Sequence, residues 1–494
     1  MDMPTLATQT AQRFTTRQLL LIDGERVDSI DGGTIEVIDP ATERVIAHVA
    51  EARAADIDRA VAAARKSFAD ARWRGLTGDA RARVLLRFAE LIEAHAEELA
   101  HIDTLDNGMP LYMSRGAVAG AALQLRAFAG ATTRIVGRAV SNAISLPGEY
   151  HAYTRREPVG VVGLITPWNG PLPTLITKLA PALASGCSLV VKPSEITPLS
   201  ALRVGELALE AGVPAGVLNV VPGVGGDAGA AMANHGDINK ISFTGSTAVG
   251  KELVRASAGN LKRITLELGG KSPCIVFDDA DMAKAIPGAA MSVFMNSGQA
   301  CIAGSRLFVE RKAFDKVVDG VAQVAKNLKV GNGFEEGIDL GPLISARQRD
   351  RVASYIEAGR KEGGEVVTGG DSAGTSGFFL NPTVFANVGR DATIMREEIF
   401  GPVIVATPFD DVEELVEVAN DTSYGLAAGI FSTNVNTVHK LAARLEAGNV
   451  YVNGYAMFDP TMPFGGMKQS GWGRELGEEG MDAFLETKSV WLAL

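Results

Sequence analysis

Among the three cysteines of the chain, Cys301 has the surroundings expected of a reactive thiol. It lies in the segment Phe294–Arg306, between an apolar helix pattern and a strand pattern, among glycines and small residues that leave room for a substrate. Cys187 and Cys274 fall at the edge and in the interior of expected strands, where packing accounts for a cysteine. No cysteine pair has the Cys-X-X-Cys spacing of a zinc site, and no histidine close to Cys301 in sequence supports a Cys–His pair.

The remaining composition narrows the chemistry to an organic cofactor, a lone thiol, or both. The six histidines include no His-Glu-X-X-His motif and no two that are four residues apart, so a protein metal site is not expected. A formal net charge of −11 argues against a general binder of nucleic acids or anionic lipids. No run approaches the ~18 apolar residues of a membrane span. Residues 1–18 lack the apolar core of a secretory signal, so we expect a mobile arm on a cytoplasmic enzyme.

Two glycine-containing segments are candidates for binding phosphate. Gly223–Gly229 follows an apolar strand pattern and contains Gly225, but its spacing departs from Gly-X-Gly-X-X-Gly, and an ordinary glycine turn also explains it. In Ser242–Gly250 a strand ends at a glycine, small hydroxyl residues follow, and a helix begins. The free N–H groups at that helix start would suit a pyrophosphate, although Gly-Ser-Thr is also a common helix cap.

Lys192 and Glu195 follow another apolar strand pattern. Pro193 ends that strand, so both charged residues lie at the carboxyl edge of a parallel sheet, where α/β proteins bind ligands. A carboxylate there can accept hydrogen bonds from both hydroxyls of an adenine ribose, and its charge would repel a 2′-phosphate. A solvated pair of loop charges fits the pattern equally well.

Apolar strands that alternate with helical patterns must position these segments. At roughly 150 residues per domain, the 494 residues correspond to about three domains or lobes. Two such series predict parallel sheets covered by helices on both faces. The first series has strands at 160–165, 188–191, 217–221, 238–244 and 264–268, with helices that include 199–211 and 247–258. The second has strands at 273–277, 305–309, 403–408 and 426–432, and helices at 281–294, 314–328, 346–362, 412–420 and 435–445.

Other stretches lie outside these two series. Residues 55–71 and the stretch 77–105 have the periodicity of helices. The glycine-rich residues 363–392 predict surface loops. The apolar residues 483–493 predict a strand, which must pair within the chain or with another subunit.

Together these segments resemble the NAD(P)-dependent aldehyde dehydrogenase superfamily, close to its hydrolytic, non-phosphorylating classes. The resemblance runs from about residue 20 to the C-terminus. The family lacks Gly-X-Gly-X-X-Gly because its Rossmann variant uses the helix after Phe-Thr-Gly-Ser. The resemblance rests on seven motifs in family order, which are Pro167-Trp-Asn169, Lys192-Pro-Ser-Glu195, Phe243-Thr-Gly-Ser246, Leu266-Glu-Leu-Gly-Gly-Lys-Ser-Pro273, the Cys301 segment, Glu398-Ile-Phe-Gly-Pro-Val403 and Pro463-Phe-Gly-Gly-Met-Lys-Gln-Ser-Gly471.

The resemblance implies a covalent mechanism with NAD as the preferred cofactor and weaker use of NADP left open. Cys301 is then the nucleophile, Asn169 the oxyanion-hole amide, and Glu267 the base that activates water to hydrolyse a thioester. Lys178 and Glu475 fall where the family has a proton relay behind that base. The implied cofactor contacts are Ile165, Thr166, Pro167, Trp168, Lys192, Glu195, Gly225, Phe243, Thr244, Gly245, Ser246, Val249, Leu268, Glu398 and Phe400.

The positions implied for the substrate tunnel depart from those of common family members. Many relatives carry an aromatic residue after the oxyanion-hole asparagine, where this chain has Gly170. No Arg or Lys stands out at the expected mouth to hold a second carboxylate, so we expect a roomy, apolar aldehyde as substrate. The tunnel residues implied are Gly170, Thr174, Thr177, Met295, Ile302, Met457, Phe458 and Phe464.

The implied fold class is α/β, with a Rossmann-variant cofactor domain, a second α/β catalytic domain and a small oligomerisation β-hairpin. The NAD-binding domain would take residues 1–137 and 155–266, and the catalytic domain residues 267–476. The oligomerisation segments would be 138–154 and 477–494. We expect the hairpin to pair with the C-terminal strand across the interface of a homodimer or homotetramer.

Two other interpretations compete with this one. A CoA-acylating aldehyde dehydrogenase would release the thioester to CoA, and such enzymes usually lack the hydrolytic glutamate, so Glu267 favours water. A catalytically silent structural protein of the same fold would tend to lose its nucleophile or its base. This chain keeps both Cys301 and Glu267.

Overall fold

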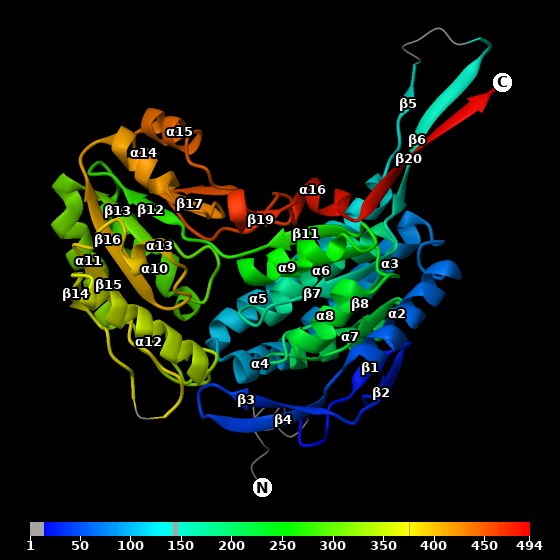
Figure 1. Ribbon diagram of the computed structural model, residues 1–494, viewed down its shortest axis with the longest axis horizontal. Helices are drawn as coiled ribbons and strands as arrows, with labels where there is room; N and C mark the ends of the chain where they lie inside the picture. The colour runs from blue at the N-terminus through cyan, green and yellow to red at the C-terminus, as the bar shows by residue number, and fades with distance from the viewer. Residues whose placement is uncertain (1–13, 142–146, 375) are drawn as a thin grey trace.

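The computed structural model describes residues 14–141, 147–374 and 376–494. The greater part of the N-terminal residues 1–18, which we expected to be mobile, lies outside the described residues. Figure 1 shows two α/β bodies side by side and a narrow arm of strands that projects away from them. We call these parts the first body, the second body and the arm. The α/β fold expected from the alternating apolar strands is confirmed.

The first body is built on an eight-stranded sheet of order β19-β11-β10-β7-β8-β9-β1-β2. Its five central strands, from β11 to β9, are parallel, and antiparallel strands close both edges. β7 and β8 are buried along their whole length, as strands covered on both faces should be. The strands are β1 Leu20–Ile22, β2 Glu25–Val27, β7 Val161–Ile165, β8 Ser188–Lys192, β9 Leu218–Val220, β10 Lys240–Thr244, β11 Arg263–Glu267 and β19 Gly471–Trp472. A separate antiparallel pair is formed by β3 Thr34–Asp39 and β4 Arg44–Ala50.

One helical pattern of the first body is divided in the structure. The stretch 77–105 forms two helices, because His95 leaves the helical conformation between them (φ −105°, ψ 22°). The helical character expected for this stretch is confirmed, and the stretch is shared between α3 and α4. The helices are α2 Ala54–Ala69, α3 Gly78–Ala94, α4 Ala96–Asn107, α5 Leu111–Ala131, α6 Pro171–Ser185, α7 Leu199–Ala211, α8 Ala230–Asn234, α9 Thr247–Ser257 and α16 Gly477–Asp482.

The second body has a seven-stranded sheet of order β14-β15-β16-β13-β12-β17-β18. The glycine-rich residues 363–392, expected to be loops, supply β14 and the buried β15, because β15 pairs in parallel with β16 and is covered on both faces. The strands are β12 Pro273–Val276, β13 Arg306–Glu310, β14 Glu365–Thr368, β15 Thr383–Ala386, β16 Val403–Phe409, β17 Ala427–Phe431 and β18 Asn449–Val452. The helices are α10 Met282–Phe294, α11 Phe314–Asn327, α12 Ala346–Lys361, α13 Thr393–Arg396, α14 Val412–Asn420 and α15 Val435–Ala442.

The arm is a three-stranded antiparallel sheet of order β20-β6-β5. β20 Leu485–Ala493 pairs along its length with β6 Tyr150–Pro158, and β5 Ala139–Val140 pairs with β6 on the other side. The expectation that the C-terminal strand pairs with this hairpin across a subunit interface was therefore wrong. The pairing is within one chain because Phe484, buried in the first body, directs β20 alongside β6, and its carbonyl accepts from Val159 N at 3.0 Å. Residues 142–146 of the expected hairpin lie outside the described residues.

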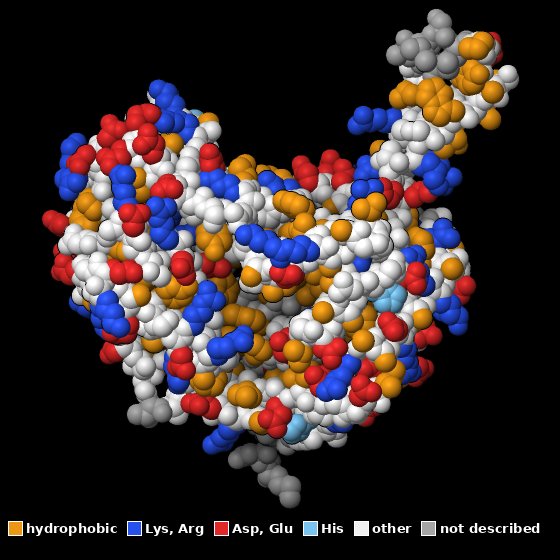
Figure 2. All heavy atoms as spheres, viewed as in Figure 1, with side chains coloured by type: hydrophobic (Ala, Val, Ile, Leu, Met, Phe, Trp, Pro, Cys, Tyr) orange, Lys and Arg blue, Asp and Glu red, His pale blue; other side chains and the backbone are white. Residues whose placement is uncertain are grey.

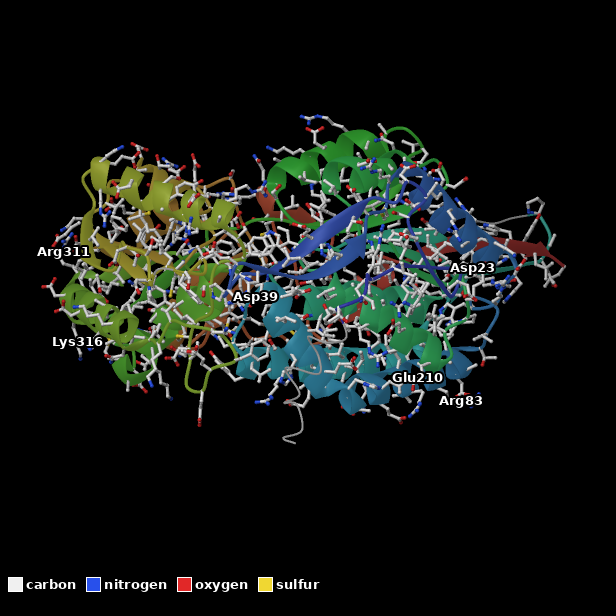
Figure 3. The ribbon with its side chains drawn as sticks, turned by 90° about the horizontal axis from the view of Figure 1, so that it is seen from below. Asp23, Asp39, Arg83, Glu210, Arg311 and Lys316 are labelled. Carbon is white, nitrogen blue, oxygen red and sulfur yellow. The ribbon has the colours of Figure 1, made fainter. Side chains whose placement is uncertain are left out.

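The turn after β3 joins the two bodies. Phe378 N of the second body donates to Pro40 O at 3.0 Å, and Gly377 N donates to the Glu43 carboxylate at 2.8 Å. Figure 3 places Asp39 where the bodies meet, with Arg311 on the second body and Asp23 on the first. No described helix combines the length and the apolar character needed to cross a bilayer. Within the same residues, no group of three or more His, Cys, Asp or Glu side chains is placed to hold a metal ion.

Candidate active site

Cys301 lies in a tight turn between α10 and β13, over the junction of the two bodies. The turn begins with a 3₁₀ segment, Met295–Gly298, in which Asn296 and Ser297 have left-handed backbone conformations (φ 52° and 53°). This kink ends α10 and redirects the chain, and the Ser297 hydroxyl anchors the turn by donating to Gly341 O at 2.7 Å. The thiol is therefore held by local backbone geometry and is only partly exposed.

Asn169 is fixed beside this turn by two hydrogen bonds to different residues of the turn. Its side-chain Nδ2 donates to Gln299 O at 2.8 Å, and its backbone oxygen accepts from Asn296 Nδ2 at 2.9 Å. One N–H of the Asn169 amide is thereby used for positioning, and a second remains for a substrate oxygen. Asn169 and Cys301 line the same two cavities, as an oxyanion donor and its nucleophile must.

Glu267 ends β11 and faces the cavity that contains Cys301. The chain returns to this place through β19, which pairs with the end of β11 and brings Glu475 close to Glu267. Glu267 is 3% exposed, and both carboxylate oxygens lack a hydrogen-bond partner among the described residues. Burial, reinforced by the nearby Glu475 charge, raises the pKa of Glu267 well above its usual value. A buried, unpaired carboxylate of raised pKa is suited to accept a proton near neutral pH.

Lys178 and Glu475 form an ion pair behind Glu267. Lys178 Nζ contacts Glu475 Oε1, and it also donates to Ser242 Oγ at 3.3 Å. Lys178 is fully buried on α6, and Glu475 is 7% exposed. The positive charge of Lys178 acts on Glu267 as well and opposes the rise in its pKa. The pair can therefore bias the protonation of Glu267.

The Cys301 thiol is neutral at physiological pH in this environment. Burial raises its pKa to about 12, and the Glu398 and Glu267 carboxylates act in the same direction. The backbone N–H groups of Cys301 and Ile302 oppose the shift but do not overcome it. A base or a bound cation must therefore help to form the thiolate, because the thiolate is the nucleophile.

A cavity of about 370 Å³ opens beside Cys301, and we call it the polar cavity because Ser246, Arg351 and Glu398 are among its lining residues. It lies between the carboxyl ends of the β7 and β10 strands and the second body, and Gly245 and Ser246 contribute to its lining. Ser246 caps α9, because its hydroxyl accepts from Val249 N at 3.4 Å. The structure thus brings together eight of the expected cofactor contacts, namely Pro167, Trp168, Thr244, Gly245, Ser246, Leu268, Glu398 and Phe400.

Three lining residues of the polar cavity come from α12, and the sequence analysis missed them. Arg351 donates to the backbone oxygen of Glu398 at 3.0 Å, and Gln348 donates to that of Phe400 at 2.8 Å. These bonds hold Phe400 in a left-handed conformation (φ 59°), with its ring edge-on to Trp168 at 5.2 Å between centroids. The two basic residues, Arg347 and Arg351, are four apart on a predicted helix, which is the signal that could have found them.

Glu398 is half-buried and lines the polar cavity. Gly270 N donates to Glu398 Oε1 at 2.9 Å, and a methyl group at Gly269 would overlap the same carboxylate. Burial raises the pKa of Glu398 to about 7, against the opposing effect of the Gly270 N–H and Arg351.

The other expected cofactor residues lie outside the lining of this cavity. Lys192 ends β8 and donates to Pro193 O at 2.9 Å and to Gly223 O at 2.8 Å, and its Nζ lies 3.5 Å from Glu195 Oε2. The Lys192 side chain passes close to Gly229, so it joins the 223–229 turn to the end of β8. Gly225 starts a single π-helical turn there. Ile165 and Phe243 are buried in their strands, Thr166 follows β7, and Val249 lies in the first turn of α9.

An apolar cavity of about 400 Å³ also opens beside Cys301. Seven of the eight expected tunnel residues line it, namely Gly170, Thr174, Thr177, Met295, Ile302, Phe458 and Phe464. Met457 does not, because its side chain is 60% exposed and lies outside the lining, so that expectation was wrong. Most of the lining residues that sequence analysis missed come from α5 and the turn before it, and these are Met109, Met113, Gly116, Ala117, Gly120 and Gln124. Pro173 and Leu476 were missed as well.

Comparison with known proteins agrees with this arrangement. Residues 27–490 match the model of the aldehyde dehydrogenase family. An aldehyde dehydrogenase of Enchytraeus buchholzi is 48% identical over 476 residues, covering 96% of this chain and 95% of that protein. A phenylacetaldehyde dehydrogenase of Pseudomonas fluorescens is 44% identical, covering 89% of this chain and 88% of that one. The structure of a Bacillus cereus aldehyde dehydrogenase in complex with NAD+ superposes with a TM-score of 0.96 at 47% identity, covering 100% of this chain and 99% of that chain. The chain therefore belongs to the aldehyde dehydrogenase family.

Proposed function

We propose that this protein oxidises an aldehyde to the carboxylic acid with NAD+, through a thioester on Cys301 that water releases. The observation that carries the proposal is the meeting of two cavities at one thiol. Cys301, Asn169 and Thr244 line both the polar and the apolar cavity. A cofactor in the first and an aldehyde in the second would therefore reach the same sulfur atom.

The polar cavity fits a nicotinamide dinucleotide. The free N–H groups at the start of α9 suit a pyrophosphate. A side chain at position 269 would overlap the Glu398 carboxylate, so the glycine there lets Glu398 keep its place in the cavity lining. Glu398 and Phe400 would hold the nicotinamide ribose and ring, and Lys192 and Glu195 the adenine ribose. When bound, the nicotinamide supplies the two-electron acceptor for the oxidation. The NAD+ complex of the Bacillus cereus relative supports this cofactor.

The first chemical task of the chain is to make and use a thiolate. Glu267 lies on the same cavity with a raised pKa and unpaired oxygens, so it can take the proton of Cys301. The thiolate then adds to the aldehyde carbon, and the carbonyl oxygen becomes an oxyanion. The free Asn169 amide N–H and the Cys301 backbone N–H would stabilise that oxyanion, and one such donor is worth ~10²–10³ in rate.

The second task is to hydrolyse the thioester that oxidation leaves on Cys301. Once Lys178 and Glu475 have carried the proton of Cys301 away, Glu267 would take a proton from water. The resulting hydroxide would attack the thioester carbon, and the carbon–sulfur bond would break to give the carboxylic acid and the Cys301 thiolate. Lys178 and Glu475, paired behind Glu267, would then return its proton to solvent. Release to CoA would need no such base in the cavity.

The apolar cavity supports a roomy, apolar aldehyde. No Arg or Lys is found among its lining residues in the described part of the chain. A second carboxylate on the substrate would therefore be buried there without a partner, which is unfavourable. The phenylacetaldehyde dehydrogenase among the relatives supports a substrate of this kind.

The arm supports assembly into a homodimer or homotetramer. Its sheet projects from the bodies and carries exposed apolar side chains, which Figure 2 shows as a cluster on the arm and which include Val140, Trp491, Leu492 and Leu494. A second copy of the chain would cover them. We further assign residues 1–137 and 155–266 to cofactor binding and 267–476 to catalysis, although β19 of the second segment pairs with β11 of the first.

The test is the appearance of reduced cofactor at 340 nm with a panel of aldehydes. We expect turnover with NAD+ and an apolar aldehyde, no acceleration by CoA, and one equivalent of acid for each cofactor reduced. Acyl-CoA as the product would contradict hydrolysis. An absence of turnover with every aldehyde would favour a silent structural protein of the same fold.

A further inference from the structure

One wall of the apolar cavity is a single face of α5. The residues that this helix contributes are spaced by three, one, three and four positions, which places them on one side of an α-helix. They are Met113, Gly116, Ala117, Gly120 and Gln124. The facing wall is the first two turns of α6, and the Thr177 hydroxyl donates to Gln124 Oε1 across the gap at 2.9 Å.

Gly116 and Gly120 have no evident structural role in α5. Both are interior to a 21-residue helix and neither has a positive φ, so the backbone conformation does not require glycine. A Cβ built at either position meets no atom within 4 Å, so packing does not require glycine. Glycine also destabilises a helix interior relative to alanine. What these two positions provide is empty space on the cavity wall.

Other helical glycines of the protein show what a packing requirement looks like. A Cβ at Gly205 in α7 would lie 2.6 Å from Leu21 Cδ2, and one at Gly320 in α11 would lie 2.7 Å from Ile286 Cδ1. Those glycines are needed because a neighbouring side chain occupies the space. Gly116, which is exposed, and Gly120, which is half-buried, are open instead, and both line the cavity that contains Cys301.

We propose that Gly116 and Gly120 form a recess that seats the ring of an aryl aldehyde, and that they determine a preference for ring-bearing over short aldehydes. This inference rests on the proposed function. The same cavity carries Phe458 and Phe464, whose ring centroids are 5.3 Å apart. Aromatic rings attract each other at such distances, so a substrate ring would have the glycine recess on one side and aromatic neighbours within the same cavity. A short aldehyde reaches Cys301 without touching the recess.

The experiment fills the recess and compares two substrates. Gly120→Leu and Gly116→Leu are assayed with phenylacetaldehyde and with acetaldehyde, and the ratio of the two kcat/KM values is compared with wild type. We expect this ratio to fall about tenfold or more in both variants, since a few methylene groups in an apolar pocket discriminate by that factor. Gly130→Leu is the matched control, because Gly130 lies on the same helix, is exposed, meets no atom at its Cβ and does not line the cavity.

Alanine variants keep the test valid if a leucine variant fails to fold. Gly116→Ala and Gly120→Ala are expected to raise Tm while lowering the same ratio by a smaller factor. An unchanged ratio in all four variants, with acetaldehyde activity intact, would overturn the recess and leave the proposed function standing. A wild-type enzyme inactive on every aldehyde would instead overturn the proposed function. A fall in the ratio for Gly130→Leu equal to that for Gly120→Leu would also overturn the recess.

Discussion

Replacing Glu267 with Gln separates the two proton transfers proposed for this carboxylate. The thiol of Cys301 has a pKa of about 12, so at pH 8, four units lower, only about one thiol in 10⁴ is ionised. Burial is the largest cause of that shift and remains in the variant. Losing the Glu267 charge therefore lowers the pKa of Cys301 only in part, and the thiol stays largely neutral. Removing a general base typically costs 10²–10⁴ in rate. We therefore expect a slow first turnover and a steady-state rate lower by that factor.

The assay is rapid mixing of Glu267→Gln with NAD+ and aldehyde, followed at 340 nm. We expect a burst of about one reduced cofactor per active site, and then very slow turnover, because the thioester is no longer hydrolysed. A thiol is neutral below its pKa, so the burst rate should rise about tenfold per pH unit between about pH 7 and about pH 10. Glu336→Gln, an exposed position away from both cavities, controls for the substitution itself. An undiminished steady-state rate would refute the assignment of Glu267 and reopen release by CoA.

Four other perturbations test separate parts of the site and the assembly. Cys301→Ala should abolish turnover while NAD+ binding, measured by calorimetry, stays intact. If this variant still oxidised aldehydes, Cys301 would not be the nucleophile. Lys178→Met should raise the pKa of Glu267 further, because the Lys178 charge opposes that shift, so the rise of kcat with pH should move to higher pH; an unmoved profile would exclude this coupling. Glu195→Gln should narrow the gap in kcat/KM between NAD+ and NADP+ by removing a like charge, and a higher kcat/KM for NADP+ in wild type would contradict the ribose assignment. Deleting residues 484–494 removes β20 from β6 and should dissociate the oligomer in light scattering, whereas a full assembly would contradict the role of the arm.

The central strands of both sheets could be predicted because burial on both faces leaves an apolar run. β7 and β8 show this, since every residue in them is buried. α5 could not be predicted, because alanine and glycine, rather than a clear stripe of large apolar residues, make up much of its sequence. The break at His95 was also hidden, because the apolar period continues across it and the kink is a matter of backbone conformation.

For the site, motifs identified the chemistry but not the walls that shape it. Cys301 and Asn169 are near in space because the kink at Asn296 brings the two turns together, and a kink of that kind has no periodic signal. The α12 and α5 walls are far from the motifs in sequence and approach the site only through packing. The C-terminal strand was predicted as a strand, but its partner within the same chain depends on where Phe484 is buried.

The most direct test of the covalent account is the intact mass of Glu267→Gln after one turnover with NAD+ and phenylacetaldehyde. The account predicts a protein heavier by the aldehyde less two hydrogen atoms, which is the mass of a thioester, with the modification located on Cys301 by peptide mapping. A gain of the whole aldehyde would mean that the thiohemiacetal forms and is not oxidised. Cofactor reduction at one equivalent with no mass gain on Cys301 would contradict the thioester and the mechanism built on it.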